Sequence, residues 1–174
     1  LSVDTTLATA DDRIKMYVNG VQETSFALRT NFGSNENINF NNSGDGQYIA
    51  RAVGTETDRM FNGYMSDVYF IDGQALTPTS FGETDSVSGN WKAKAYSGSY
   101  GTNGFFLQFN NSGALGTDSS GNTNTFTVNN LTSVDQSTDT PTTNFATLNS
   151  LIVSGSPAYA NGNTQIVTIG DNDS

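Results

Sequence analysis

The sequence predicts an all-β fold, and three observations lead to this prediction. Apolar and polar side chains alternate in residues 13–18, as they do in half-buried strands. An Asn-Gly pair follows directly, and this pair favours the tight turn of a β-hairpin. Gly, Asn, Ser and Thr are frequent, aromatic residues make up 11% of the chain, and no amphipathic helical stripe extends beyond two turns. With 174 residues the chain is long enough for one domain or for parts of two.

The first predicted element is a hairpin of residues 13–18 and 21–26. The two faces of its first strand separate mainly apolar from mainly polar side chains: Ile14, Met16 and Val18 against Arg13, Lys15 and Tyr17. Between the strands, Asn19 and Gly20 suit a type I′ turn, because both central positions of that turn require a positive φ.

The segment that follows is predicted to be a long polar loop and then further strands. The loop covers residues 27–46 and includes a short strand at 38–40. Another strand is expected at 47–53. The densest apolar stretch, residues 59–72, is predicted to be a strand, with a bulge at 66–67 that corrects the phase of its side chains.

The second half of the chain is predicted to alternate between loops and short strands. Residues 83–104 are rich in Gly, Ser and Tyr and are expected to form a loop. Strands are expected at 105–109, 125–128 and 164–169. Residues 129–150 are rich in Thr, Asn and Asp and are predicted to be an extended linker.

The composition excludes several classes of function. The chain has no His and no Cys, so it can form no Ser-His-Asp triad, no Cys-His pair and no disulfide. Its net charge of -10 argues against a nucleic-acid partner, because such binding depends on Lys and Arg at the phosphates. No apolar run is long enough to predict insertion into a membrane.

Two segments carry a resemblance to a known superfamily. Arg13–Gly20 (RIKMYVNG) and Phe61–Phe81 (FNGYMSDVYFIDGQALTPTSF) resemble a recurrent hairpin and the closing strand and turn of concanavalin A-like lectin and laminin-G domains. The positions that match the closing motif are Phe61, Gly63, Met65, Asp67, Val68, Phe70, Ala75 and Leu76. The resemblance implies an antiparallel β-sandwich of the jelly-roll type.

A narrower resemblance points to a class of bacteriophage virion proteins. Residues 70–85, residues 101–149 and the Trp91-Lys92 step are similar to tail-fibre and other particle-surface polypeptides, in which a laminin-G-like domain precedes a second β-sandwich. This resemblance implies a viral structural or adhesion protein on the particle surface, outside the cell. Its expected partners are copies of itself, other virion proteins and host cell-surface polysaccharide.

The position of the closing motif implies how the domains are divided. Because that motif lies near the end of a laminin-G-like domain, residues 1–83 are expected to be the C-terminal part of an incomplete jelly roll, with the rest upstream of Leu1. Residues 84–150 are expected to be an extension with short strands and a linker. Residues 151–174 are expected to hold the first strand of a following β domain.

Acidic residues are the first candidates for chemistry. Some concanavalin A-like proteins are glucanases, and a retaining glycosidase needs two carboxyl groups about 5 Å apart. In this sequence Asp67 lies on a predicted strand and Asp72 ends it, while the Asp11-Asp12 pair lies in a turn. The pattern favours solvated turn acids over a hydrolytic site, so no catalytic residue is predicted.

Residues 118–124 (DSSGNTN) are a candidate calcium loop. Asp118, Asn122 and Asn124 offer side-chain oxygen atoms around Gly121, and oxygen atoms are the ligands that Ca²⁺ prefers. The alternative is an Asx-turn loop, in which the same side chains bind their own backbone. Ca²⁺ is therefore a candidate cofactor and not a required one.

A candidate carbohydrate site lies in the Gly- and Ser-rich segment. Trp91, Tyr96 and Tyr100 could stack on sugar rings, and the amides of Asn90 and Asn103 could bind hydroxyl groups. The alternative is that the three aromatic residues form a packing or interface cluster. The function expected from the sequence is a non-catalytic fibre, spike or similar appendage that contacts host glycans. The alternatives are a purely structural capsid decoration or connector protein and, third, a glycan-cleaving enzyme.

Overall fold

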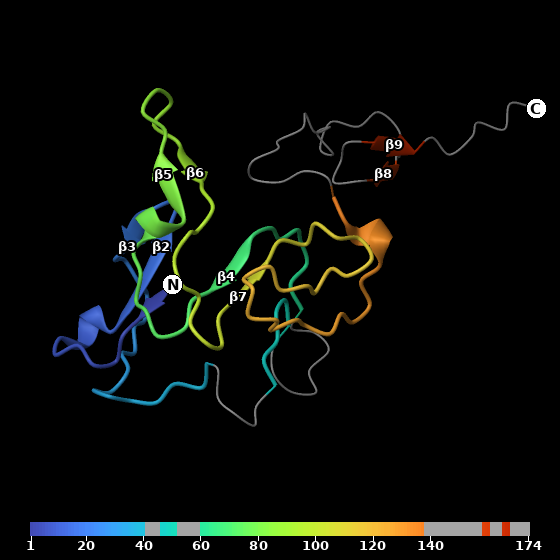
Figure 1. Ribbon diagram of the computed structural model, residues 1–174. Helices are drawn as coiled ribbons and strands as arrows, with labels where there is room; N and C mark the ends of the chain where they lie inside the picture. The colour runs from blue at the N-terminus through green and yellow to red at the C-terminus, as the bar shows by residue number, and fades with distance from the viewer. Residues whose placement is uncertain (41–45, 52–59, 138–157, 161–164, 168–174) are drawn as a thin grey trace, which may run out of the picture. The chain divides into compact units, whose positions relative to one another are not determined.

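The computed structural model is an all-β structure built from short strands (Figure 1). It describes residues 1–40, 46–51, 60–137, 158–160 and 165–167. Across these residues the strands are β1 (Ser2–Val3), β2 (Ile14–Val18), β3 (Val21–Glu23), β4 (Val68–Phe70), β5 (Gly82–Thr84), β6 (Trp91–Ala93), β7 (Phe105–Leu107), β8 (Ala158–Ala160) and β9 (Gln165–Val167). The 3₁₀ helices are η1 (Ala10–Asp12), η2 (Pro78–Ser80) and η3 (Ser133–Asp135), and none of the described residues is in an α-helix. The all-β prediction is confirmed.

The chain divides into two compact units. Leu1–Met65 and Phe70–Gly104 form unit 1, and Ser66–Tyr69 and Phe105–Ser174 form unit 2. The domain boundaries predicted after residues 83 and 150 stay a prediction. In the described ranges, no helix is long and apolar enough to cross a membrane.

Unit 1 contains the predicted hairpin. Strand β2 pairs antiparallel with β1 on one side and with β3 on the other, and Val18 lies opposite Val21. Asn19 has a φ of 50° and Gly20 a φ of 81°, so both turn residues have the positive φ expected of a type I′ turn. Strand β3 ends at Glu23, three residues before the predicted end.

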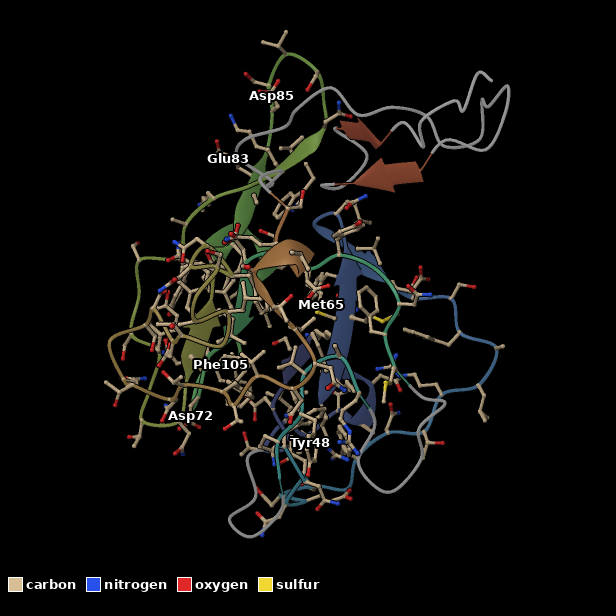
Figure 2. The ribbon with its side chains drawn as sticks, turned by 90° about the vertical axis from the view of Figure 1, so that its right-hand side faces the viewer. Tyr48, Met65, Asp72, Glu83, Asp85 and Phe105 are labelled. Atoms are coloured by element: carbon tan, nitrogen blue, oxygen red, sulfur yellow. The ribbon has the colours of Figure 1, made fainter. Side chains whose placement is uncertain are left out.

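A second hairpin in unit 1 was not predicted. Strands β5 and β6 pair antiparallel, with Thr84 opposite Trp91, and all of their residues but Gly82 lie in the segment expected to be a loop. The side chain of Asp85 closes the turn between them, because its Oδ1 accepts hydrogen bonds from the backbone N–H groups of Val87 (3.0 Å) and Ser88 (2.8 Å). In Figure 2, Glu83 and Asp85 lie along this hairpin toward its turn, where both pair with Lys92.

Three of the predicted strands do not form as expected. Residues 38–40 and residues 125–128 are not part of a strand, although the N–H of Phe126 donates to a backbone carbonyl. In the segment 47–53, Ala50 has a left-handed φ of 66°, which interrupts extended backbone, and residues 52 and 53 lie outside the described residues.

The long strand predicted over residues 59–72 is reduced to β4. Asp67 has a left-handed φ of 51°, and the strand begins directly after it at Val68. Met65 therefore lies before the strand. Its side chain does not have to alternate with those of β4, so no bulge at residues 66–67 is needed.

Among the described residues of unit 2, strand β7 carries the most buried side chain. Leu107 is 1% exposed, Leu115 is 6% exposed, and the rings of Tyr69 and Phe106 stack with their centroids 4.2 Å apart. Strand β7 ends at Leu107 rather than at the predicted Phe109, because Phe109 has a left-handed φ of 55°. Strands β8 and β9 form a further antiparallel pair, and β9 lies within the strand predicted at 164–169.

Candidate functional site

Trp91, one of three aromatic residues predicted to bind sugar, lies half-buried at the start of β6. Its indole approaches two backbone segments that carry glycine. A Cβ atom at Gly20 would lie 2.4 Å from the Cε3 atom of the ring, and one at Gly82 would lie 2.4 Å from the Cζ2 atom. Both distances are far below van der Waals contact, so the indole fits only because neither glycine carries a Cβ atom.

The indole also borders an open hollow of about 190 Å³, which we call the aromatic hollow. The residues that line it are Leu1, Tyr17, Asn19, Gly20, Leu76, Thr77, Pro78, Phe81 and Trp91. Three aromatic rings therefore share one depression with an amide and a hydroxyl group. This combination suits a sugar, whose apolar ring face stacks on aromatic rings while its hydroxyl groups form hydrogen bonds.

Tyr96 and Tyr100 form a ring cluster with Phe81. Tyr96 stacks on Phe81 with ring centroids 5.2 Å apart, and it meets Tyr100 edge-to-face, also at 5.2 Å. The hydroxyl group of Tyr96 donates to the carbonyl of Ser99 at 3.0 Å. Neither tyrosine is among the described residues that line the aromatic hollow. Phe81 alone joins this cluster to the hollow.

The two residues predicted to supply amides lie in different settings. The backbone carbonyl of Asn90 accepts a hydrogen bond from the N–H of Asp85 at 2.7 Å, in the turn of the β5–β6 hairpin. Asn103 donates both its backbone N–H and its Nδ2 to Oδ2 of Asp72, each at 3.1 Å. A glycan-binding role for Asn90 and Asn103 stays a prediction.

The predicted calcium loop is organised around Asp118, which is 9% exposed. Its Oδ1 accepts hydrogen bonds from the N–H groups of Phe106 (2.9 Å) and Ser120 (2.8 Å). Its Oδ2 accepts from the Ser120 hydroxyl and from the N–H of Asn124, both at 2.8 Å. Burial by itself raises the pKa of Asp118, but the hydrogen bonds outweigh burial and lower that pKa.

These hydrogen bonds are the ones expected if residues 118–124 form an Asx-turn loop, the alternative to a calcium loop. The N–H groups of Ser120 and Asn124 point at the Asp118 carboxylate, and the N–H of Asn122 donates to the Ser120 hydroxyl at 3.2 Å. In the part of the chain that the structure describes, no three acidic side chains gather as a metal site. Binding of Ca²⁺ by Asp118, Asn122 and Asn124 stays a prediction.

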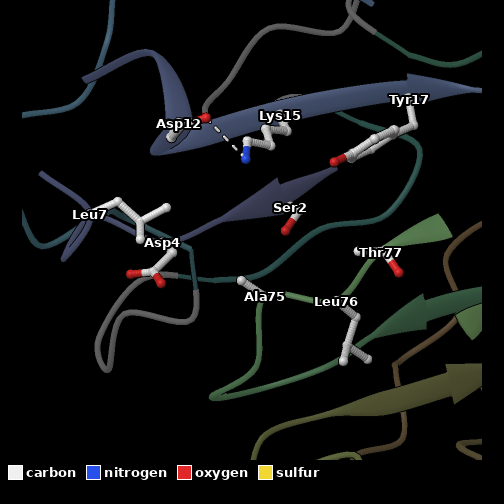
Figure 3. A pocket seen from close by; sticks show the side chains of 9 residues that line it. All are labelled: Ser2, Asp4, Leu7, Asp12, Lys15, Tyr17, Ala75, Leu76 and Thr77. Carbon is white, nitrogen blue, oxygen red and sulfur yellow. Dashed lines mark ion pairs between the residues drawn. The ribbon is translucent and has the colours of Figure 1, made fainter. Parts of the chain in front are cut away.

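A second hollow, of about 160 Å³, also belongs to unit 1, and we call it the charged hollow (Figure 3). It is lined by Ser2, Asp4, Leu7, Asp12, Lys15, Tyr17, Ala75, Leu76 and Thr77. Nζ of Lys15 lies 3.0 Å from Oδ1 of Asp12. The hydroxyl and N–H of Thr6 both donate to Oδ1 of Asp4, and these bonds lower the pKa of that carboxyl group.

Among the residues that line the aromatic hollow, Trp91 alone was predicted as a site residue, and the aromatic and polar side chains that the prediction missed are Tyr17, Asn19, Thr77 and Phe81. A signal for Tyr17 was present, because the alternation of the strand places it with Lys15 on the face opposite Met16. Asn19 was recognised only as a turn residue. Phe81 carries no local signal, since its place in the hollow depends on contacts between distant segments.

Comparisons with known proteins do not assign this chain to a family. A scan against protein-family models, a search of curated proteins and a search of solved structures each found no match. Function must therefore be inferred from the geometry of the two hollows and from the motifs of the sequence.

Proposed function

We propose that this chain is a non-catalytic protein of a bacteriophage particle surface, a fibre, spike or similar appendage that contacts host glycans. The observation that carries the proposal is the aromatic hollow, where Trp91 and Tyr17 share one depression with the polar side chains of Asn19 and Thr77. The laminin-G-like and phage-like motifs supply the viral context. The all-β structure is compatible with a partial jelly roll followed by a second β domain, which is part of the proposal.

The charges near the hollows favour binding over catalysis. Glycoside hydrolysis needs a pair of carboxyl groups, one of them with a raised pKa so that it can act as an acid. Hydrogen bonds from Thr6 lower the pKa of Asp4, and Asp12 is paired with Lys15. Burial raises the pKa of Asp67, but Asp67 belongs to unit 2 and lines neither hollow.

A purely structural role as a capsid decoration or connector protein is the second candidate. It is favoured by the apolar face of the β2–β3 hairpin, where Val18 and Val21 lie opposite each other and are 57% and 72% exposed. Contiguous exposed apolar surface is typical of contacts with other chains. The partners would be further copies of this chain or other virion proteins.

Binding to intact host cells and to a glycan array tests the proposal. Asn19→Gly removes the amide from the aromatic hollow and keeps the turn, because Gly accepts the positive φ at this position. Asn35→Gly is the matched control, since Asn35 is exposed, has a φ of 55° and does not line the hollow. Trp91→Phe reduces the stacking area in the same hollow.

We expect saturable binding that both Asn19→Gly and Trp91→Phe weaken and that Asn35→Gly leaves unchanged. Circular dichroism of each variant verifies that it is folded. Equal binding by all variants, or no binding by the folded wild-type protein, would reject the glycan proposal and favour the structural role.

A further inference from the structure

The aromatic and charged hollows adjoin each other, and we call the two together the groove. They share three lining residues, Tyr17, Leu76 and Thr77. Figure 3 shows the side chains of β2 along one side of the charged hollow and residues 75–77 along the other. A ligand longer than one sugar can therefore reach from the indole of Trp91 past Tyr17 to the charged end.

The charged end carries more negative than positive charge. The charged side chains that line it are the carboxylates of Asp4 and Asp12 and the ammonium group of Lys15. The ion pair with Asp12, at 3.0 Å, already engages Lys15. Both bonds to Asp4 end on Oδ1, and within the described residues its Oδ2 accepts no hydrogen bond. A carboxylate oxygen that borders a hollow is thus open to a donor from a ligand.

Resting on the proposed function, we propose that the groove binds an oligosaccharide with a free amino group, one sugar lying at Trp91 and the ammonium group of another binding Oδ2 of Asp4. A positively charged amine donates a charge-assisted hydrogen bond to this oxygen. The hydroxyl groups of Ser2 and Tyr17 line the same end and can bind the hydroxyl groups of that sugar.

The charge balance distinguishes this ligand from two related ones. A sugar acid would bring a third carboxylate close to Asp4 and Asp12, and like charges at an interface are unfavourable. An N-acetylated amino sugar has no positive charge, so it gains no charge-assisted bond from Asp4. The net charge of -10 on the whole chain also attracts a cationic ligand.

Isothermal titration calorimetry with two oligosaccharides of equal length tests this inference. One is a chitosan oligosaccharide with free amines, and the other is the N-acetylated chitin oligosaccharide. Asp4→Asn removes the charge and retains a side-chain oxygen for the bonds from Thr6. Glu23→Gln is the control, because it changes the net charge equally from the opposite face of the sheet, where Glu23 pairs with Met16.

We expect the wild-type protein to bind the amine oligosaccharide about tenfold more tightly than the acetylated one. Asp4→Asn should abolish this preference, and Glu23→Gln should retain it. Equal affinity for both ligands, or an equal loss in the two variants, would overturn the amine site. If Asn19→Gly then still weakened both ligands without a loss of stability, the proposed glycan function would stand. Binding of neither ligand would also overturn the inference, and the host-cell assay would separately decide the proposed function.

Discussion

The substitution Gly20→Ala tests whether the indole of Trp91 is packed against the β2–β3 turn. The new Cβ meets two unfavourable conditions, a left-handed backbone with φ of 81° and a ring atom 2.4 Å away. Gly89→Ala meets only the first, because Gly89 has a φ of 72° and no atom would lie within 4 Å of a Cβ at this position. Both glycines belong to unit 1, so the difference between the variants isolates the contact with Trp91.

The expected free-energy changes follow from these two conditions. Left-handed backbone costs alanine about 1–2 kcal/mol at either position. Overpacking against the ring adds about 1–3 kcal/mol at Gly20 alone. Gly20→Ala should therefore lower the free energy of unfolding by about 2–5 kcal/mol in total, against about 1–2 kcal/mol for Gly89→Ala.

Urea unfolding followed by fluorescence measures both variants in unit 1, because Trp91 is the sole tryptophan of the chain. In a Trp91→Ala background, followed by circular dichroism, the extra cost at Gly20 should disappear, since the ring atoms that cause it are gone. Equal destabilisation by the two single variants, or an extra cost that survives Trp91→Ala, would refute this packing.

Two further predictions concern acidic side chains that organise turns. Hydrogen bonds from the N–H groups of Ser88 and Val87 and from the Ser88 hydroxyl lower the pKa of Asp85 to about 2. The ionised Asp85 carboxylate therefore stabilises the fold fully above its unfolded pKa of 3.8, and this stabilisation is lost as the pH falls toward 2. NMR amide signals of Ser88 should follow this loss, and Asp85→Asn should remove the pH dependence. Asp118→Asn replaces one acceptor oxygen with an amide donor and should destabilise unit 2 by about 2–3 kcal/mol in urea unfolding. An unchanged midpoint would contradict the account of Asp118, whereas a midpoint that Ca²⁺ raises only when Asp118 is present would establish the calcium hypothesis.

Local signals predicted the β2–β3 hairpin because its determinants are adjacent in the chain. Alternation in residues 13–18 defines the strand, and Asn19 and Gly20 supply the two positive φ values of the turn. The β5–β6 hairpin lacks both signals. Its strands are three residues long, too short for alternation to be recognised, and the Asp85 side chain closes a turn that no Asn-Gly pair marks.

Left-handed residues explain most of the strands that were predicted too long. Ala50, Asp67 and Phe109 each have a positive φ between 51° and 66°, and each one interrupts or limits a predicted strand. Asn and Asp adopt this conformation more readily than most residues, so Asp67 could have been suspected. Nothing in the local sequence singles out Ala50 or Phe109, because their conformation depends on contacts with the rest of the chain.

The candidate site shows the same division between local and distant information. Trp91 could be selected by residue type alone, but its neighbours in the hollow, Tyr17 and Phe81, come from separate segments of unit 1. Proximity in the chain instead suggested a group of Trp91 with Tyr96 and Tyr100. The structure places those tyrosines in a cluster with Phe81.

Trp91 combines two roles that residue type cannot separate. Its indole occupies the space left by Gly20 and Gly82, and the same ring borders the aromatic hollow. Loss of binding in Trp91→Ala would therefore be expected whether the ring contacts a glycan directly or only holds two hairpins in place. Asn19→Gly resolves the two roles, because it keeps the turn and the indole while it removes a polar group that only a ligand in the hollow would use. Weaker glycan binding without a change in stability would assign Asn19 to recognition and the hollow to the ligand.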